Sequence, residues 1–159
     1  MNNACTLATA LGPITLRWND RGLVCAIDLL TEVAPAPAAK LPPPAQRVAT
    51  AIQAHLAGQP AQYALADLDL SACTAFARQV YTYLHDIPPG QTRTYGQLAA
   101  ALGKPGAARA VGRAMATNPV PLAVPCHRVV ARHGLGGFTG GLDFKRRLLA
   151  MEGARLIGE

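Results

Sequence analysis

Residues 118–130 read NPVPLAVPCHRVV and are the most informative part of this sequence. Three prolines restrict the backbone before Cys126, and an imidazole and a guanidinium follow it at His127 and Arg128. Positive charge near a thiol lowers its pKa, and the thiolate is the reactive form of cysteine. The stretch therefore predicts a nucleophile at Cys126. If the backbone were an extended strand, His127 would point away from the sulfur and could reach it only across a tight turn or through a water.

Helical patterns dominate the chain from residue 71 onward. Thr94 and Gln97 have the spacing of a capping box, which opens a helix. Two short helices joined by a glycine-containing turn are typical of a helix-turn-helix, although alanine-rich helix pairs are also common in protein cores. The predicted helices run from the Thr74 cap to about Asp86, over residues 95–102, over residues 107–117 and over residues 143–152, the last with Phe144, Leu148 and Met151 on its apolar face.

The N-terminal third predicts a small antiparallel sheet. Apolar segments at residues 6–9, 14–18 and 23–29 are separated by turn signals around Gly12-Pro13 and at residues 19–22. A helix is expected to follow over residues 45–57. The predicted fold class is α+β, with a scaffold lobe over residues 1–70 and a helical domain over residues 71–159 that carries the thiol.

Composition limits the class of protein. The chain has 159 residues, of which 50% are apolar and 15% charged, so it folds as one domain or as one domain with a small lobe. No apolar run approaches the roughly 18 residues of a membrane-spanning helix, and the N-terminus lacks a secretory signal, which predicts a cytoplasmic protein. The four cysteines lack CxxC spacing and are expected to be reduced, with Cys25 and Cys73 as small buried side chains.

Positive charge is concentrated in the second half of the chain. Residues 1–75 carry 4 basic and 5 acidic side chains, whereas residues 76–159 carry 11 basic and 4 acidic side chains. A polyanion is the natural partner of such a domain. A solvated basic surface without a partner is the alternative.

The motifs of the second half resemble the O6-alkylguanine-DNA alkyltransferase family. The resemblance rests, in family order, on RAVG at 109–112, Asn118-Pro119, PCHRVV at 125–130, the segment from Gly140 to Lys145, and Glu152-Gly153. It implies irreversible transfer of an alkyl group from the O6 position of guanine in DNA to Cys126, once per molecule and without a cofactor. Some relatives bind a structural zinc in the N-terminal lobe, but Cys5 and Cys25 have no matching histidine partners here, so we expect no metal. The resemblance also implies an RNase H-like N-terminal lobe and a monomer that binds the minor groove of duplex DNA. Activity on O4-alkylthymine and cooperative binding to DNA stay open.

The resemblance also assigns catalytic roles around the thiol. His127 corresponds to a base that acts through a water, and Glu152 to the carboxylate that orients the imidazole. Asn118 corresponds to a hinge that holds the cysteine turn. Tyr95 corresponds to the acid that protonates the leaving guanine at ring nitrogen three.

Further residues correspond to the family's DNA and base contacts. Arg109 matches an arginine that fills the place of a base flipped out of the duplex. Small side chains on the same helix suit a close approach to the minor groove. Phe138 stands where many relatives have tyrosine, so a phenolic hydrogen bond to the base is lost. The expected DNA-binding set is Arg109, Tyr95, Ala107, Ala108, Ala110, Arg113 and Arg128, with the run Lys145–Arg147 as a candidate phosphate contact, and the expected pocket residues are Pro121, Val129, Phe138 and Thr139.

Two functions of other classes fit parts of the sequence. A non-catalytic helix-turn-helix module with a merely buried cysteine predicts that Cys126→Ala changes nothing measurable. A thiol hydrolase that uses Cys126 and His127 predicts repeated turnover of an acyl substrate.

Overall fold

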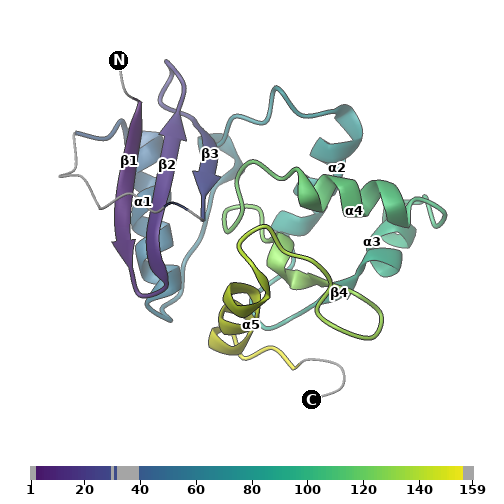
Figure 1. Cartoon of the computed structure of the whole chain (residues 1–159). Coiled ribbons are helices and arrows are strands. Elements are labelled where there is room, and N and C mark those ends of the chain that lie inside the picture. Colours follow the sequence, from purple (N-terminus) through teal and green to yellow (C-terminus); the bar gives the residue numbers. More distant parts are fainter. Residues whose placement is uncertain (1–2, 30, 32–39, 156–159) are drawn as a thin grey trace. The chain divides into compact units, whose positions relative to one another are not determined.

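The computed structural model describes residues 3–29, 31 and 40–155, and the chain divides into two compact units (Figure 1). The first unit comprises Met1–Ala72 and Pro119–Ala123, and the second comprises Cys73–Asn118 and Val124–Glu159. The segment Pro119–Ala123, just before the cysteine turn, was expected in the second unit but belongs to the first. The division of the chain into domains after residue 70 stays a prediction.

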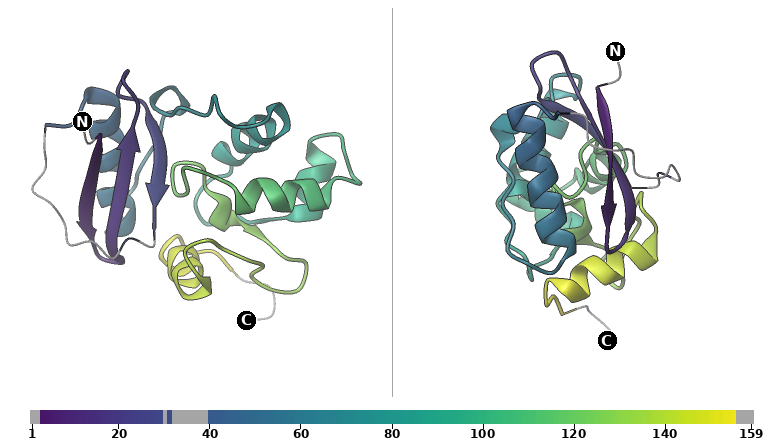
Figure 2. Two further views of the ribbon diagram at one scale, coloured as in Figure 1. Left: turned by 45° about the horizontal axis from the view of Figure 1, so that its top comes forward. Right: turned by 90° about the vertical axis from the view of Figure 1, so that its left-hand side faces the viewer.

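The first unit is a three-stranded antiparallel sheet covered by one helix, which Figure 2 shows edge-on. Alternate residues of the strands point to the helix, and Ile14, Leu16 and Ile52 are fully buried between the two layers. The expected antiparallel sheet is confirmed, whereas the RNase H-like resemblance stays a prediction. The elements are β1 (Ala4–Thr9), β2 (Gly12–Trp18) and β3 (Val24–Asp28) in the order β1-β2-β3, then α1 (Pro43–Leu56) and a 3-10 turn, η1 (Leu65–Asp67).

Two boundaries in the first unit differ from the prediction. The first hairpin turns at residues 10–11, so Gly12 and Pro13 already belong to β2. The proline is tolerated because, among the described residues, β3 pairs with β2 only from Thr15 onward, so no described strand residue on that side needs an N–H group at position 13. Helix α1 starts at Pro43, two residues earlier than predicted, because proline suits the first turn of a helix.

The second unit is mostly helical. Thr74 caps its first helix by accepting a hydrogen bond from the Ala77 amide, and the Thr94–Gln97 capping box is formed in both directions. A short parallel pair joins the residues before the second helix to those after Cys126. The elements are α2 (Ala75–His85), β4 (Arg93–Thr94), α3 (Tyr95–Ala101), α4 (Ala108–Ala116), the 3-10 turn η2 (Cys126–Arg128), β5 (Val129–Val130) and α5 (Leu142–Met151).

Helix α4 is fixed on one face and free on the other. Val111 is fully buried, and the Tyr81 hydroxyl of α2 donates a hydrogen bond of 2.7 Å to the Ala114 carbonyl. Arg109 and Arg113 lie on the exposed face. Both arginines are therefore exposed to solvent and take no part in the packing of the core.

Helix α5 buries a different set of residues from the one predicted. Leu148 is buried as expected, but Met151 is 36% exposed and Lys145, which was expected on the outer face, is fully buried. The residues that face the core are therefore Lys145 and, three and four positions later on the same side of the helix, Leu148 and Leu149. Among the described residues, no helix is both long and apolar enough to cross a membrane.

Candidate active site

The backbone before Cys126 makes a tight turn rather than a strand. Pro125 has φ −79° and ψ 66°, an inverse γ-turn that brings the Cys126 amide to 2.8 Å from the Val124 carbonyl oxygen. The side-chain amide of Asn118 donates a second hydrogen bond, of 3.0 Å, to the same oxygen. Residues 126–128 then form η2, so the backbone at Cys126 and His127 is a turn and the geometry of an extended strand does not apply there.

The thiol of Cys126 is buried, with 4% of the residue exposed. Burial raises the pKa of Cys126 above its ordinary value, whereas a hydrogen bond from Asn118 and the charge of Lys145 act in the opposite direction. The expectation of a lowered thiol pKa is therefore wrong for the protein at rest, because desolvation outweighs the nearby positive charge. A base must take the proton before the sulfur can attack.

His127 is the candidate for this base, and its imidazole is bonded to a buried carboxylate. Its Nε2 atom is 2.9 Å from Oε2 of Glu152, and both side chains are buried. Two hydrogen bonds from Arg128 hold the same carboxylate, Nε to Oε1 at 2.9 Å and Nη2 to Oε2 at 2.8 Å, while Nη1 donates to the Ile87 carbonyl at 2.7 Å. The carboxylate is thus fixed on both oxygens and can orient the imidazole and stabilise its protonated form.

Arg128 has a different place from the one expected. It is 7% exposed, and its guanidinium is bonded to Glu152 and to a backbone carbonyl. A guanidinium in this position does not reach a phosphate on the protein surface. The expectation that Arg128 binds DNA is therefore corrected: its contacts hold Glu152.

A cavity of about 360 Å³ opens onto the thiol. This volume lies in the range of small-molecule sites, and a few polar groups among apolar walls are typical of such sites. One wall is Phe138, whose ring lies edge-on to His127 at 6.5 Å and packs against Phe144 at 6.1 Å. The residues that line the cavity are Tyr95, Gly112, Met115, Ala116, Cys126, Gly137, Phe138 and Thr139.

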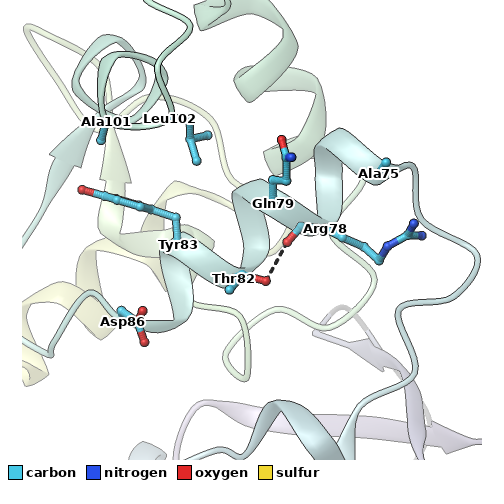
Figure 3. A pocket seen from close by; sticks show the side chains of 8 residues that line it. All are labelled: Ala75, Arg78, Gln79, Thr82, Tyr83, Asp86, Ala101 and Leu102. Atoms are coloured by element: carbon cyan, nitrogen blue, oxygen red, sulfur yellow. Dashed lines mark hydrogen bonds between the residues drawn. The ribbon is translucent and has the colours of Figure 1, made fainter.

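A second hollow, of about 670 Å³, lies between α2 and the end of α3 (Figure 3). Its most prominent side chains are Tyr83, Arg78 and Asp86. None of the described residues that line it is a cysteine or a histidine. It lacks the thiol, so the cavity at Cys126 is the candidate active site.

Tyr95 reaches the cavity past a glycine that leaves it room. Gly136 has φ +72°, and a Cβ atom there would come within 2.7 Å of the Tyr95 hydroxyl and 3.1 Å of its Cε2 atom. Burial raises the pKa of Tyr95, and a backbone interaction with Gly137 lowers it. The phenol therefore stays protonated at neutral pH and can act as an acid.

We expect Gly136→Ala to displace the Tyr95 hydroxyl and to slow the chemistry of this cavity by about tenfold or more, since about 1.4 kcal/mol of transition-state stabilisation suffices for that. Gly12→Ala is the control, because Gly12 also has a positive φ but has no atom within 4 Å of its Cβ position. Reaction rates and melting temperatures of both variants check the prediction. Equal rates for the two would show that Tyr95 does not need this gap.

Comparison with known proteins identifies the family. The family described as 6-O-methylguanine DNA methyltransferase, DNA binding domain, matches residues 75–154. A methylated-DNA–protein-cysteine methyltransferase of Methanothermobacter thermautotrophicus is 40% identical over 144 residues, which cover 89% of this chain and 80% of that protein. The chain belongs to the 6-O-methylguanine DNA methyltransferase family. It is a DNA-repair methyltransferase whose alkyl acceptor is a cysteine.

Other relatives of this methyltransferase agree with the assignment. The methylated-DNA–protein-cysteine methyltransferase of Salmonella typhimurium is 54% identical over 85 residues, about half of each chain. The O6-methylguanine methyltransferase of Mycobacterium tuberculosis superimposes with a TM-score of 0.80 at 34% identity and covers 100% of this chain and 97% of that one. A structure of the OGT protein of the same organism in complex with DNA gives a TM-score of 0.77 at 35% identity, over 94% and 92% of the two chains. These structures also share the mixed α/β architecture.

The structure brings some of the expected site residues of the methyltransferase together and separates others. Tyr95, Cys126, Phe138 and Thr139 line one cavity. Of the described residues, Pro121 and Val129 do not line it. The remaining expected residues are His127 and Glu152, which are bonded to each other, Asn118, which is bonded to the turn before Cys126, and Arg109, Arg113, Ala107, Ala108 and Ala110, which lie on or just before α4.

Sequence reasoning missed the roles of two residues near the cavity, Gly136 and Lys145, and it did not predict four of the residues that line the cavity, Gly112, Met115, Ala116 and Gly137. Gly136 carries no signal beyond a glycine-rich stretch, because its role depends on a tyrosine about forty positions earlier in the chain. The spacing of Lys145 relative to Leu148 and Leu149 could have placed it on the buried face of α5. A lysine is so seldom buried that the charge outweighed the spacing.

Proposed function

We propose that this methyltransferase moves the alkyl group from O6 of guanine in duplex DNA to the Sγ atom of Cys126 in one irreversible event. The observation that carries the proposal is the cavity that is lined by the buried thiol, the Tyr95 phenol and the Phe138 ring, together with the bonded pair of Glu152 and His127, the residue that directly follows the cysteine. An alkyl carbon requires a soft nucleophile, which a thiolate supplies better than a hydroxyl or an imidazole.

The proposed transfer moves two protons and exchanges one bond. His127 takes the proton of Cys126, through a water, and Glu152 stabilises the imidazolium that results. The S–C bond forms while the C–O6 bond breaks, and the electron pair of that bond stays on the guanine. Tyr95 gives its proton to ring nitrogen three, so that guanine leaves as a neutral base. The thioether has no leaving route, and each molecule therefore acts once.

We also infer that α3 and α4 act as a helix-turn-helix whose second helix enters the minor groove. This inference is supported by the excess of basic over acidic side chains from residue 76 onward and by the exposed arginines of α4. Arg109 would take the place of the flipped base, and the alanines around it would allow close approach. The unit that begins at Cys73 would then hold the chemistry, with the first unit as a scaffold, in a cytoplasmic monomer.

We expect Arg109→Ala to slow repair in duplex DNA by about tenfold to a hundredfold and to leave the reaction with a free alkylated guanine base almost unchanged, because only the duplex imposes an unstacking cost of a few kcal/mol. Arg21→Ala, a change at an exposed arginine of the first unit, serves as the control. Rates on both substrates check the prediction. Equal losses on duplex and free base would contradict the flipping role.

Mass spectrometry of the intact protein and its peptides tests the proposed function. The protein is incubated with an oligonucleotide that contains 6-O-methylguanine, or with an unmodified one. We expect one methyl group on Cys126, on no other cysteine, and only with the modified DNA. Bound DNA without any mass gain would indicate a lesion-binding module, and repeated turnover of an acyl substrate would indicate a hydrolase.

A further inference from the structure

We propose that Lys145 is a positioning residue for alkyl transfer, which holds the loop at Gly137 so that Tyr95 and Cys126 keep their relative places. The proposal rests on the proposed function, because it assigns Lys145 an effect on the acid Tyr95. Lys145 itself is not one of the residues that line the cavity and acts through the backbone.

The contacts of Lys145 are those of a clamp. The residue is fully buried, and its Nζ atom donates hydrogen bonds to the Val129 carbonyl at 2.7 Å and to the Gly137 carbonyl at 3.1 Å. Val129 opens β5 directly after the turn that carries Cys126. One ammonium group on α5 therefore joins the segment that follows the nucleophile to the loop that lines the cavity.

The loop at Gly136 and Gly137 packs against the phenol of Tyr95. Gly136 leaves no room for even a Cβ atom against the Tyr95 hydroxyl, and the backbone of Gly137 interacts with that hydroxyl. The next two residues, Phe138 and Thr139, line the cavity. A shift of the loop would thus move the phenol and one wall together, and a displacement of about 1 Å can slow an enzymatic step about a hundredfold.

The burial of a cation at this place argues for such a role. An ammonium group is seldom buried, because it loses its hydration, and burial lowers the pKa of Lys145 to about 8 while the nearby Cys126 acts in the opposite direction. An apolar side chain would fill the same face of α5, beside Leu148 and Leu149, without this cost. What an apolar side chain cannot supply is a donor for two carbonyls that belong to different segments.

A double-mutant cycle tests the proposal in the full-length protein with duplex DNA that contains 6-O-methylguanine. Transfer rates are measured against DNA concentration for Lys145→Met, Tyr95→Phe and the double variant. We expect Lys145→Met to lower the limiting transfer rate about tenfold to a hundredfold and to leave the half-saturating DNA concentration unchanged. We also expect Tyr95→Phe to have much less effect in the Lys145→Met background than alone.

Lys40→Met is the matched control, since Lys40 is an exposed lysine of the first unit. Lys145→Gln retains an N–H donor and is expected to keep part of the rate, and it replaces Lys145→Met in the cycle if that variant does not fold.

Three outcomes overturn the proposal. Effects that multiply in the double variant would show that Lys145 does not act through Tyr95. An unchanged limiting rate with a raised half-saturating concentration would make Lys145 a DNA-binding residue. Tyr95→Phe without any effect alone would remove Tyr95 from the proposed mechanism, a result that is distinguishable because Lys145→Met would then be slow by itself.

Discussion

Cys126→Ser is expected to abolish methyl transfer, with a fall in rate of at least about a thousandfold, because a buried hydroxyl is a far weaker nucleophile toward an alkyl carbon than a thiolate. Serine keeps the size and the hydrogen-bonding capacity of the side chain, so the turn held by Asn118 and Pro125 should persist. Mass spectrometry after incubation with methylated DNA should find no added methyl group. Binding to DNA should survive, because no part of the exposed surface changes.

Cys25→Ser is the matched control for this variant. Cys25 is only half-buried and lies on β3 of the first unit, and the structure likewise leaves Cys73 half-buried, contrary to the expectation of two small buried side chains. The Cys25→Ser change should leave the transfer rate unchanged. Methylation that persists in Cys126→Ser would move the acceptor to another residue, and unmethylated wild type would contradict the whole mechanism.

Arg128→Met is expected to lower the free energy of unfolding by about 3–5 kcal/mol, the cost of leaving a buried charge without its partner. Arg128 supplies both oxygens of Glu152 with hydrogen bonds and also satisfies the Ile87 carbonyl. Without it, the carboxylate loses two hydrogen bonds, and the imidazole of His127 loses a partner of fixed orientation. The transfer rate should fall as well. Urea titration at neutral pH measures the stability, and single-turnover kinetics measure the rate.

A second variant separates the ion pair from general packing. Glu152→Gln alone also breaks the pair, but the double variant Arg128→Met with Glu152→Gln removes both charges and should be less unstable than the sum of the single changes. Arg132→Met, at an exposed position, is the control for loss of a surface cation. An Arg128→Met variant of full stability and weakened DNA binding would restore the original expectation of a phosphate contact.

Local chemistry explains why the helices of the second unit could be predicted. The Thr74 cap and the Thr94–Gln97 box involve residues at most three positions apart, so the sequence contains every participant. Hairpin turns are also local, but the first one lies at residues 10–11 because Gly12 and Pro13 can be accommodated at the start of β2. Whether a proline is tolerated in a strand depends on which neighbour pairs with it, and that neighbour is remote.

The sequence by itself determined the family motif, the candidate nucleophile and the order of the main elements, since these rest on residue identity and short spacings. Only the tertiary structure decided the state of the charged groups near the thiol. Lys145 and Arg128 read as surface cations, yet both are buried because backbone carbonyls and, for Arg128, Glu152 lie within hydrogen-bond distance. The pKa of Cys126 follows the same rule: burial, which depends on contacts between distant segments, raises it more than Asn118 and the charge of Lys145 lower it.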